Sequence, residues 1–301
     1  MEKFQRGKGN GLTDLITSFW QTYNTLIYTI FVHGMLALSI YITLACGQLS
    51  LGNAAFMGIG AYTSALLTMK MNAPFGLSLI AGGMMPAAVA LIIGIPTLRL
   101  SGVYLAMATL GFGEVVRVAF LNMSITGGSL GLNGVPLKTE LWHLVLVIGI
   151  FIYFFIRLRD SRFGRILEAI NEDEVVASVM GIKTTYFKVW AFTIGAFIAG
   201  VAGGLNAHFT FFISPREYGF EPAVDILTFA ILGGTRTLWG PLAGSTVLTT
   251  LPELFRFLGP YRLAVNGLIL LLVVLYLPNG IVSKETFKNI KKIFNGSGCL
   301  N

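Results

Sequence analysis

Charged residues are scarce in this sequence. Of its 301 residues, 21 are Lys or Arg and 14 are Asp or Glu, so 12% carry a charge, about half of the roughly 25% usual in soluble domains. Apolar residues make up 54%, which excludes a disordered chain. The two cysteines, Cys46 and Cys299, are too few for a disulfide scaffold. Much of the surface must therefore face something other than water.

The motifs of several enzyme classes are also missing. The phosphate-binding pattern G-x-x-x-x-G-K-[ST] does not occur, so we expect no ATP site of that kind on this chain. His33, His143 and His208 are scattered without metal-ligand spacing. There is no Ser-His-Asp set and no pair of carboxylates placed for acid–base work. We expect neither an enzyme nor a metal site, and we attribute the net charge of +7 to membrane topology rather than to nucleic-acid binding.

Long runs without charge are abundant. Positions 15–69 contain no Asp, Glu, Lys or Arg, and a helix of that length would extend roughly 80 Å, against about 30 Å for a bilayer core. The run should therefore cross a membrane twice, with a turn at Cys46–Ser50, where glycine and polar residues occur together. A soluble bundle would need polar helix faces, and residues 263–277 have none.

The sequence predicts an all-α polytopic membrane protein with about eight to ten transmembrane helices. The 222–234 segment is too short to cross alone and reads as half of a broken helix, and 123–136 reads as an external loop rich in Gly, Ser and Asn. We expect an N-terminal tail over 1–22, a membrane domain over 23–283 and a C-terminal tail over 284–301. The expected spans are about 23–45, 51–69, 75–96, 101–121, 141–157, 187–212, 222–234, 239–257 and 262–278.

The basic residues indicate orientation, because Lys and Arg concentrate in cytoplasmic loops. One basic cluster lies in the 157–188 segment and another in the C-terminal tail, so we place both in the cytoplasm. Five expected spans precede Arg157, which puts the N-terminus outside, against the three basic residues at positions 3, 6 and 8. Either an early segment is re-entrant or the N-terminus is outside.

Residues 157–188 are the largest polar stretch between spans, with six basic and five acidic residues. Apolar residues recur at helical spacing from Phe163 to Val179, Asp160 or Ser161 is placed to cap the start, and Gly181 is placed to end the helix. The pattern predicts one short amphipathic helix. It is either a solvated linker or a docking element for a soluble partner.

Five sequence blocks carry a family resemblance. In order, they are 48–66 (QLSLGNAAFMGIGAYTSAL), 99–117 (RLSGVYLAMATLGFGEVVR), 126–136 (TGGSLGLNGVP), the 157–188 segment and 232–244 (LGGTRTLWGPLAG). Over about residues 35–282 the chain resembles the branched-chain amino acid permeases of ABC importers, of the LivM-like type. Thr235–Thr237 departs from that pattern, since small residues are more usual there.

The resemblance implies an inverted-repeat, type II ABC importer permease in a bacterial or archaeal cytoplasmic membrane. Its partners would be a second homologous permease, two cytoplasmic ATPase subunits that carry the ATP and Mg²⁺, an extracytoplasmic solute-binding protein and membrane lipid. This chain would bind no cofactor and no nucleic acid. The stretch from Glu168 to Gly181 resembles the coupling loop that seats on the ATPase, and the residues it implicates are Arg165, Glu168, Ala169, Glu172, Asp173, Glu174 and Gly181.

Glycines and intramembrane charges give the candidates for the transport pathway. Glycine-interrupted apolar segments at 51–60 and 232–244 either pack helices closely or form broken helices along a midplane pathway. Glu114 and Arg117 are spaced to pair, as are Glu253 and Arg256, and Asp225 either caps a broken helix or meets the substrate's ammonium group. The pathway candidates are Gly52, Asn53, Phe56, Gly58, Gly60, Glu114, Asp225, Gly233 and Gly234.

Two alternatives remain open at this point. A urea or amide permease of the same family would share the architecture. A self-sufficient channel or secondary transporter would explain the glycines but would give the 157–188 segment no task.

Overall fold

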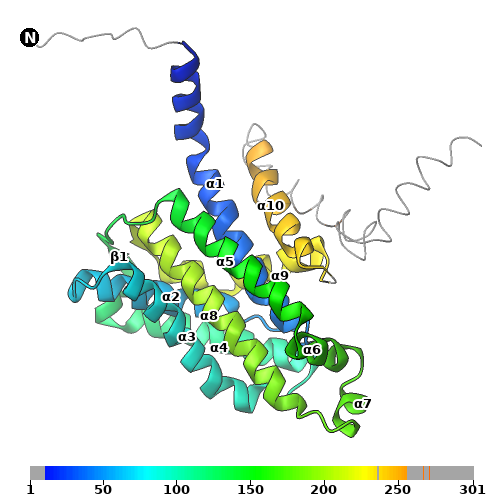
Figure 1. The fold of residues 1–301 in the computed structure, drawn as a ribbon. Helices are drawn as coiled ribbons and strands as arrows, with labels where there is room; N and C mark the ends of the chain where they lie inside the picture. Colours follow the sequence, from blue (N-terminus) through cyan, green and yellow to red (C-terminus); the bar gives the residue numbers. More distant parts are fainter. Residues whose placement is uncertain (1–10, 236, 256–266, 268–270, 272–301) are drawn as a thin grey trace, which may run out of the picture.

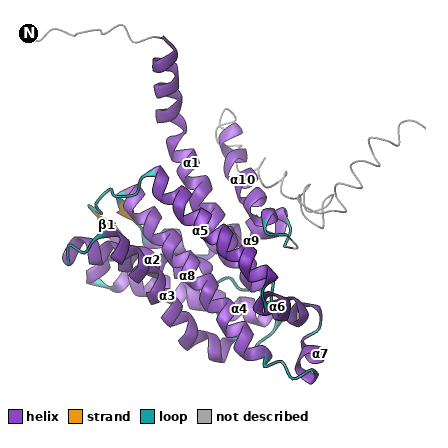
Figure 2. Ribbon diagram, viewed as in Figure 1, coloured by secondary structure: helices purple, strands orange, loops and turns teal. Residues whose placement is uncertain are grey.

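The computed structural model describes residues 11–235, 237–255, 267 and 271. The predicted span at 262–278, the tail at 284–301 and Arg256 of the proposed Glu253–Arg256 pair lie outside the described residues, apart from positions 267 and 271. The described part is a helical bundle, as predicted (Figures 1 and 2). Five of its helices are long and apolar enough to cross a membrane: Tyr23–Leu44 within α1, and α3, α4, α5 and α8.

Most helices follow the predicted spans closely, but α1 begins at Gly11, so residues 11–22 of the expected N-terminal tail are helical. The first half comprises α1 (Gly11–Leu44), α2 (Asn53–Lys70), α3 (Phe75–Thr97), α4 (Gly102–Asn122) and α5 (Leu141–Asp160). The second comprises α6 (Arg162–Glu172), α7 (Glu174–Val179), α8 (Thr184–Thr210), α9 (Phe220–Gly233) and α10 (Trp239–Leu254). At 14 residues, α9 is about 21 Å long, which is too short to cross a bilayer, as the 222–234 segment predicts.

Helix α8 is the centre of the bundle and packs against α1, α2 and α3. Its small residues allow backbones to meet, as small residues do between membrane helices. A Cβ on Gly60 of α2 would overlap the carbonyl oxygen of Gly200, and a Cβ on Gly203 would overlap that of Met57. These glycines therefore set the distance between α2 and α8.

The segment between α4 and α5 is an ordered cap rather than a plain loop. It contains short 3₁₀ turns at Ser124–Thr126 and Gly128–Leu130, followed by β1 (Leu132–Asn133). Strand β1 pairs antiparallel with β2 (Phe212–Ile213), which follows α8, with Leu132 opposite Ile213. The cap thus joins the ends of α4, α5 and α8 (Figure 2).

The two ends of the bundle can be told apart by their contacts. At one end, Tyr28 of α1 donates a hydrogen bond to the carbonyl of Thr139, just before α5. At the other end, Gly47, just after α1, lies against Asn171 of α6. The start of α1 and the α6–α7 segment therefore lie at opposite ends of the bundle (Figure 1).

Candidate functional site

The predicted amphipathic helix at 163–179 is two helices, so the prediction of one continuous helix was wrong. Ser161 caps α6 by accepting a hydrogen bond from the backbone N–H of Gly164 at 3.3 Å, as one of the two predicted caps. Asp173 interrupts the run with an extended backbone and accepts bonds from the N–H groups of Val175 (2.8 Å) and Val176 (3.0 Å). Its carboxylate thereby starts a new helix, α7.

Gly181 ends this segment as predicted. It adopts a φ of +85°, and its N–H bonds to the carbonyl of Ser178 while that of Ile182 bonds to Ala177. This is the Schellman arrangement, in which a left-handed residue closes the last turn of a helix. The reversal directs the chain from α7 into α8.

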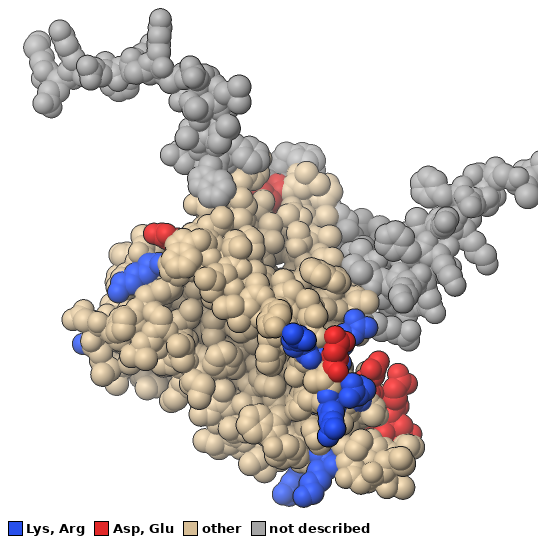
Figure 3. Space-filling model, viewed as in Figure 1, with Lys and Arg blue, Asp and Glu red and all other residues tan. Residues whose placement is uncertain are grey.

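Helix α7 and the residue after it carry apolar side chains that are exposed to solvent. Val179 is 81% exposed and Met180 77% exposed, and we call these two, with Val175 and Val176, the α7 patch. The candidate coupling residues surround it: Arg165, Glu168, Ala169, Glu172, Asp173 and Glu174 are exposed in α6 and at the start of α7. Figure 3 shows a dense group of charged side chains at this end of the molecule, beside a large uncharged face, with fewer charges at the opposite end.

One coupling candidate is connected directly to the bundle. The carboxylate of Glu174 forms an ion pair with the ammonium group of Lys188. Lys188 is buried in the second turn of α8. Cys46, in the turn after α1, is buried in the same region, and burial raises the pKa of its thiol to about 12. The sequence placed Lys188 only in a basic cluster. The sequence signal that could have predicted its burial was the position of Lys188 at the start of a long apolar run.

Three pathway candidates meet in the bundle where α2, α4 and the start of α9 come together. A Cβ on Gly58 would lie 2.7 Å from Tyr218, in the 3₁₀ turn Pro215–Tyr218 that precedes α9. Glu114 pairs with Arg117, with 2.7 Å between Oε2 and Nε, so the predicted pairing is confirmed. Gly219 lies against both of these side chains. The ring of Phe56 packs against the ring of Phe112 of α4, and the two ring planes are tilted by 42°.

This junction contains buried hydroxyl groups that sequence reasoning missed. The side-chain oxygens of Tyr62 and Tyr218 are buried and have no hydrogen-bond partner within the described part of the chain. The rings of Tyr62 and Tyr218 are 6.1 Å apart. Buried polar atoms without partners are uncommon and mark places where water or a ligand bonds.

Gly52 lies beside this junction, against Phe56 of α2 and Thr109 of α4, and the other pathway candidates lie elsewhere. Gly52 and Asn53 begin α2, where the Asn53 amide donates to Ser39 of α1 at 2.7 Å. Gly233 and Gly234 end α9, with Gly234 at a φ of +95°, and a Cβ on Gly233 would overlap the carbonyl of Gly240. These glycines allow α9 and α10 to touch at their shared turn.

Asp225 does not cap a helix. Helix α9 begins at Phe220 with Gly219 as its N-cap and no side-chain cap, and Asp225 is exposed in the second turn. The capping alternative is therefore wrong, because α9 begins six residues earlier than that role requires. A role toward substrate stays a prediction.

The histidines have packing roles among the described residues. His208 is fully buried, 3.0 Å from the hydroxyl of Thr68 and 2.8 Å from the carbonyl of Gly204. His33 shares a hydrogen bond with Thr249 of α10 at 2.8 Å. No group of three or more His, Cys, Asp or Glu side chains that could hold a metal occurs in the described ranges.

A family model described as "Branched-chain amino acid transport system / permease component" matches residues 22–277. The chain belongs to this family. It is 32% identical over 293 residues to the high-affinity branched-chain amino acid transport system permease protein LivM of Salmonella typhimurium, covering 86% of this chain and 68% of that protein. The LivM protein of Escherichia coli K12 matches equally well.

Other members of the family match over shorter regions. The LivH permease protein of Salmonella typhimurium is 31% identical over 156 residues, covering 51% of this chain and 50% of that protein. No solved structure matches the chain. Membership of this permease family agrees with the apolar helices of the bundle, and the relatives are transport permeases rather than enzymes.

Proposed function

We propose that this chain is a membrane-spanning permease subunit of an ABC importer for branched-chain or related amino acids. The proposal rests on the combination of an exposed apolar α7 patch with an ion pair that connects α7 to a buried lysine of α8. An apolar helix face flanked by charge is suited to insertion in a groove of a partner protein. The partner would be a cytoplasmic ATPase subunit, and a second permease would complete the membrane domain.

In the proposed mechanism, the ATPase-binding segment α6–α7 is coupled to the transport pathway within the bundle. Closure of the ATPase subunits moves α6 and α7, and the Lys188–Glu174 pair transmits that movement to α8 and the helices packed on it. Rocking of the two permeases then exposes the pathway to one side of the membrane at a time. The junction of α2, α4 and α9 is the proposed pathway, because its unpartnered hydroxyls suit the polar ends of an amino acid and its aromatic rings suit an apolar side chain.

The proposed orientation follows from the same arrangement. With α6 and α7 in the cytoplasm, the start of α1 and the β1–β2 cap lie outside. The N-terminus is then extracytoplasmic despite its three basic residues, and the cap faces the solute-binding protein. An accessibility assay on a cysteine placed in the first ten residues tests this orientation.

The test of coupling uses the complete transporter in proteoliposomes. Val179→Asp places a charge in the α7 patch and is expected to release the ATPase subunits and abolish ATP-driven uptake. Leu130→Asp changes an equally exposed apolar side chain in the external cap and should leave ATPase binding intact. Coupled uptake by Val179→Asp at the parent level would refute the role of α7.

Two further measurements address the remaining alternatives. Binding of leucine, isoleucine, valine and urea to the cognate solute-binding protein separates an amino acid importer from a urea or amide importer. Solute flux through this chain reconstituted alone, without ATPase or second permease, would show a self-sufficient channel or carrier instead.

A further inference from the structure

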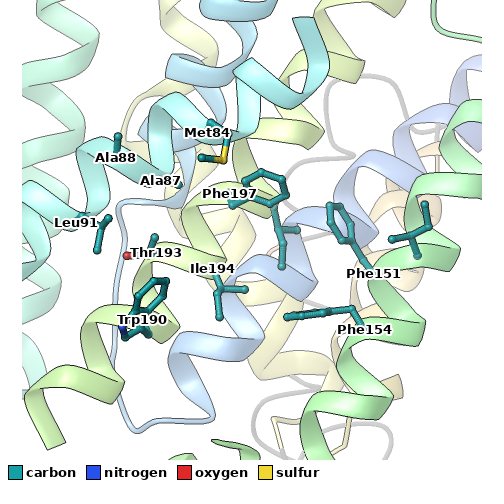
Figure 4. Close-up of a pocket in the computed structure, with 12 residues that line it drawn as sticks. Met84, Ala87, Ala88, Leu91, Phe151, Phe154, Trp190, Thr193, Ile194 and Phe197 are labelled. Carbon is teal, nitrogen blue, oxygen red and sulfur yellow. The ribbon is translucent and has the colours of Figure 1, made fainter. Parts of the chain in front are cut away.

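An apolar groove of about 520 Å³ runs along the outer surface of the bundle (Figure 4). Helix α8 forms its floor, with Trp190, Ile194 and Phe197 directed into it, and α3 and α5 form its two walls. Its volume lies in the range of about 300 to 1,000 Å³ typical of small-molecule sites. It is separate from the α2–α4–α9 junction, since the two share no lining residue.

The lining excludes an amino acid as the ligand. Thr193 supplies the one hydroxyl among the lining residues, and that hydroxyl already donates to the carbonyl of Val189 at 2.8 Å. The ammonium and carboxylate groups of an amino acid would lose their hydration without gaining partners, which is costly. A hydrocarbon chain loses nothing on entering the same groove.

The depth of the groove places it in the half of the bundle nearest α6. Phe154 lies six residues before the end of α5, and Trp190 lies six residues after the start of α8. The groove therefore opens into the leaflet on the α6–α7 side. A bilayer surrounds this face with acyl chains, and the headgroup layer extends about 5 to 7 Å beyond the hydrocarbon boundary.

Three cationic side chains lie toward that boundary, one within α5 and one just beyond the end of each of α3 and α8 that lies on this side. Arg157 follows Phe154 by three residues, and its guanidinium is held over the Tyr153 ring, 5.7 Å from the centroid. Lys183 is the N-cap residue of α8, seven residues before Trp190. Arg99 follows α3, and all three side chains are exposed.

We propose that this groove binds one acyl chain of an anionic phospholipid whose phosphate lies against Arg157 and Lys183. The apolar lining selects hydrocarbon, and the positive charge at the mouth selects an anionic headgroup. Each Lys or Arg near a membrane surface strengthens binding of anionic lipid about fivefold. The inference does not depend on which solute the transporter moves.

The experiment uses Trp190, which lines the groove, as a fluorescent reporter. In the assembled transporter, with Trp20, Trp142 and Trp239 replaced by Phe, detergent-solubilised protein is titrated with phosphatidylglycerol or phosphatidylcholine brominated on the acyl chains. We expect saturable quenching, at least about fivefold tighter for phosphatidylglycerol. A matched protein that retains only Trp142, at the far end of α5, should show non-saturating quenching that does not depend on the headgroup.

Two variants separate the contributions of tail and headgroup. Ala88→Phe fills the groove with an apolar ring and should remove the saturable quenching, whereas Val115→Phe on the exposed face of α4 should not. Arg157→Gln with Lys183→Gln should remove the preference for phosphatidylglycerol while leaving quenching in place. Equal quenching by both lipids in the parent protein would overturn the proposal. Absence of any quenching would overturn it as well, because a protein segment would then cover the groove.

Discussion

Lys188 of α8 forms an ion pair with Glu174 of α7, with 2.5 Å between Nζ and Oε2. The lysine side chain is 9% exposed and the glutamate side chain 45% exposed. The pair therefore joins a core helix to a surface helix. Because only the lysine is buried, only its ammonium charge depends on the partner for neutralisation.

Removing the carboxylate should destabilise the protein. Glu174→Gln leaves a buried ammonium group without a counter-charge, and the expected loss is about 1 to 3 kcal/mol, as for hydrogen bonds to charged groups. Thermal unfolding followed by tryptophan fluorescence measures this loss. Glu172→Gln is the control, because Glu172 is exposed and forms no ion pair within the described ranges. Equal unfolding temperatures for the two variants would contradict the assignment.

The contact between α2 and α8 predicts a strong effect at Gly60. Gly60→Ala places a methyl group on the backbone of Gly200, so α2 and α8 must separate, and we expect loss of folded protein in size-exclusion chromatography. Gly111→Ala is the matched control in α4, where a Cβ meets nothing within 4 Å. That change should be neutral or stabilising by up to about 1 kcal/mol, since alanine favours helix. Normal yield of Gly60→Ala would disprove the close contact.

At Gly181 the expected effect is purely conformational. A Cβ there meets nothing within 4 Å, but the φ of +85° costs an L-residue about 1 to 2 kcal/mol. Gly181→Ala should therefore weaken coupling, raising the ATP hydrolysed per solute transported, while Gly181→Asn should be milder because Asn tolerates this conformation. If both variants couple normally, the turn between α7 and α8 is not required for transmission.

Because the Tyr218 hydroxyl has no partner in the described structure, we predict that removing it lowers transport without lowering stability. Tyr218→Phe removes a buried polar atom that has no partner in the described structure, so thermal stability should stay the same or rise. Uptake should fall if that hydroxyl meets the solute, with the apparent KM rising by about 5- to 10-fold for loss of one hydrogen bond. Unchanged uptake kinetics would remove Tyr218 from the pathway.

Cys46 should be unreactive in the folded protein. It is 1% exposed, and its pKa is raised to about 12, so almost no thiolate forms at neutral pH. In a Cys299→Ser background, N-ethylmaleimide labelling should be slow from pH 7 to 9 and complete after unfolding. The folded state retains a proton that the unfolded chain releases near pH 9, so the stability contributed by the protonated thiol is lost as pH rises from about 9 toward 12. Fast labelling of the native protein would contradict this burial.

The sequence predicted most of the bundle, because each span depends on a local property, a long run without charge. Most of the described helices begin and end within about three residues of the predicted spans. The β1–β2 pairing was beyond such reasoning, since Leu132 and Ile213 are far apart in the chain and pair only after α8 is in place. The short strands also lack the alternating pattern that announces a sheet.

The candidate site was predicted in parts. The Glu114–Arg117 pair was predictable because three-residue spacing places both side chains on one helix face. The break at Asp173 was missed because apolar spacing continues across it, and only the carboxylate's bonds to two N–H groups reveal the new helix start. The burial of Tyr218 depends on tertiary packing and has no local signature.

The glycine contacts of α8 give the bundle a mechanical property. At Gly60, Gly200 and Gly203 the backbone of α8 contacts the backbones of α2 and α3 directly, so at these points no change of rotamer can make room for one helix to slide past another. The three helices must therefore tilt together as one rigid body. Its longest helix, α8, has 27 residues and is about 40 Å long. A tilt of about 5° at the Lys188 end would displace the far end by about 3 Å, given that length.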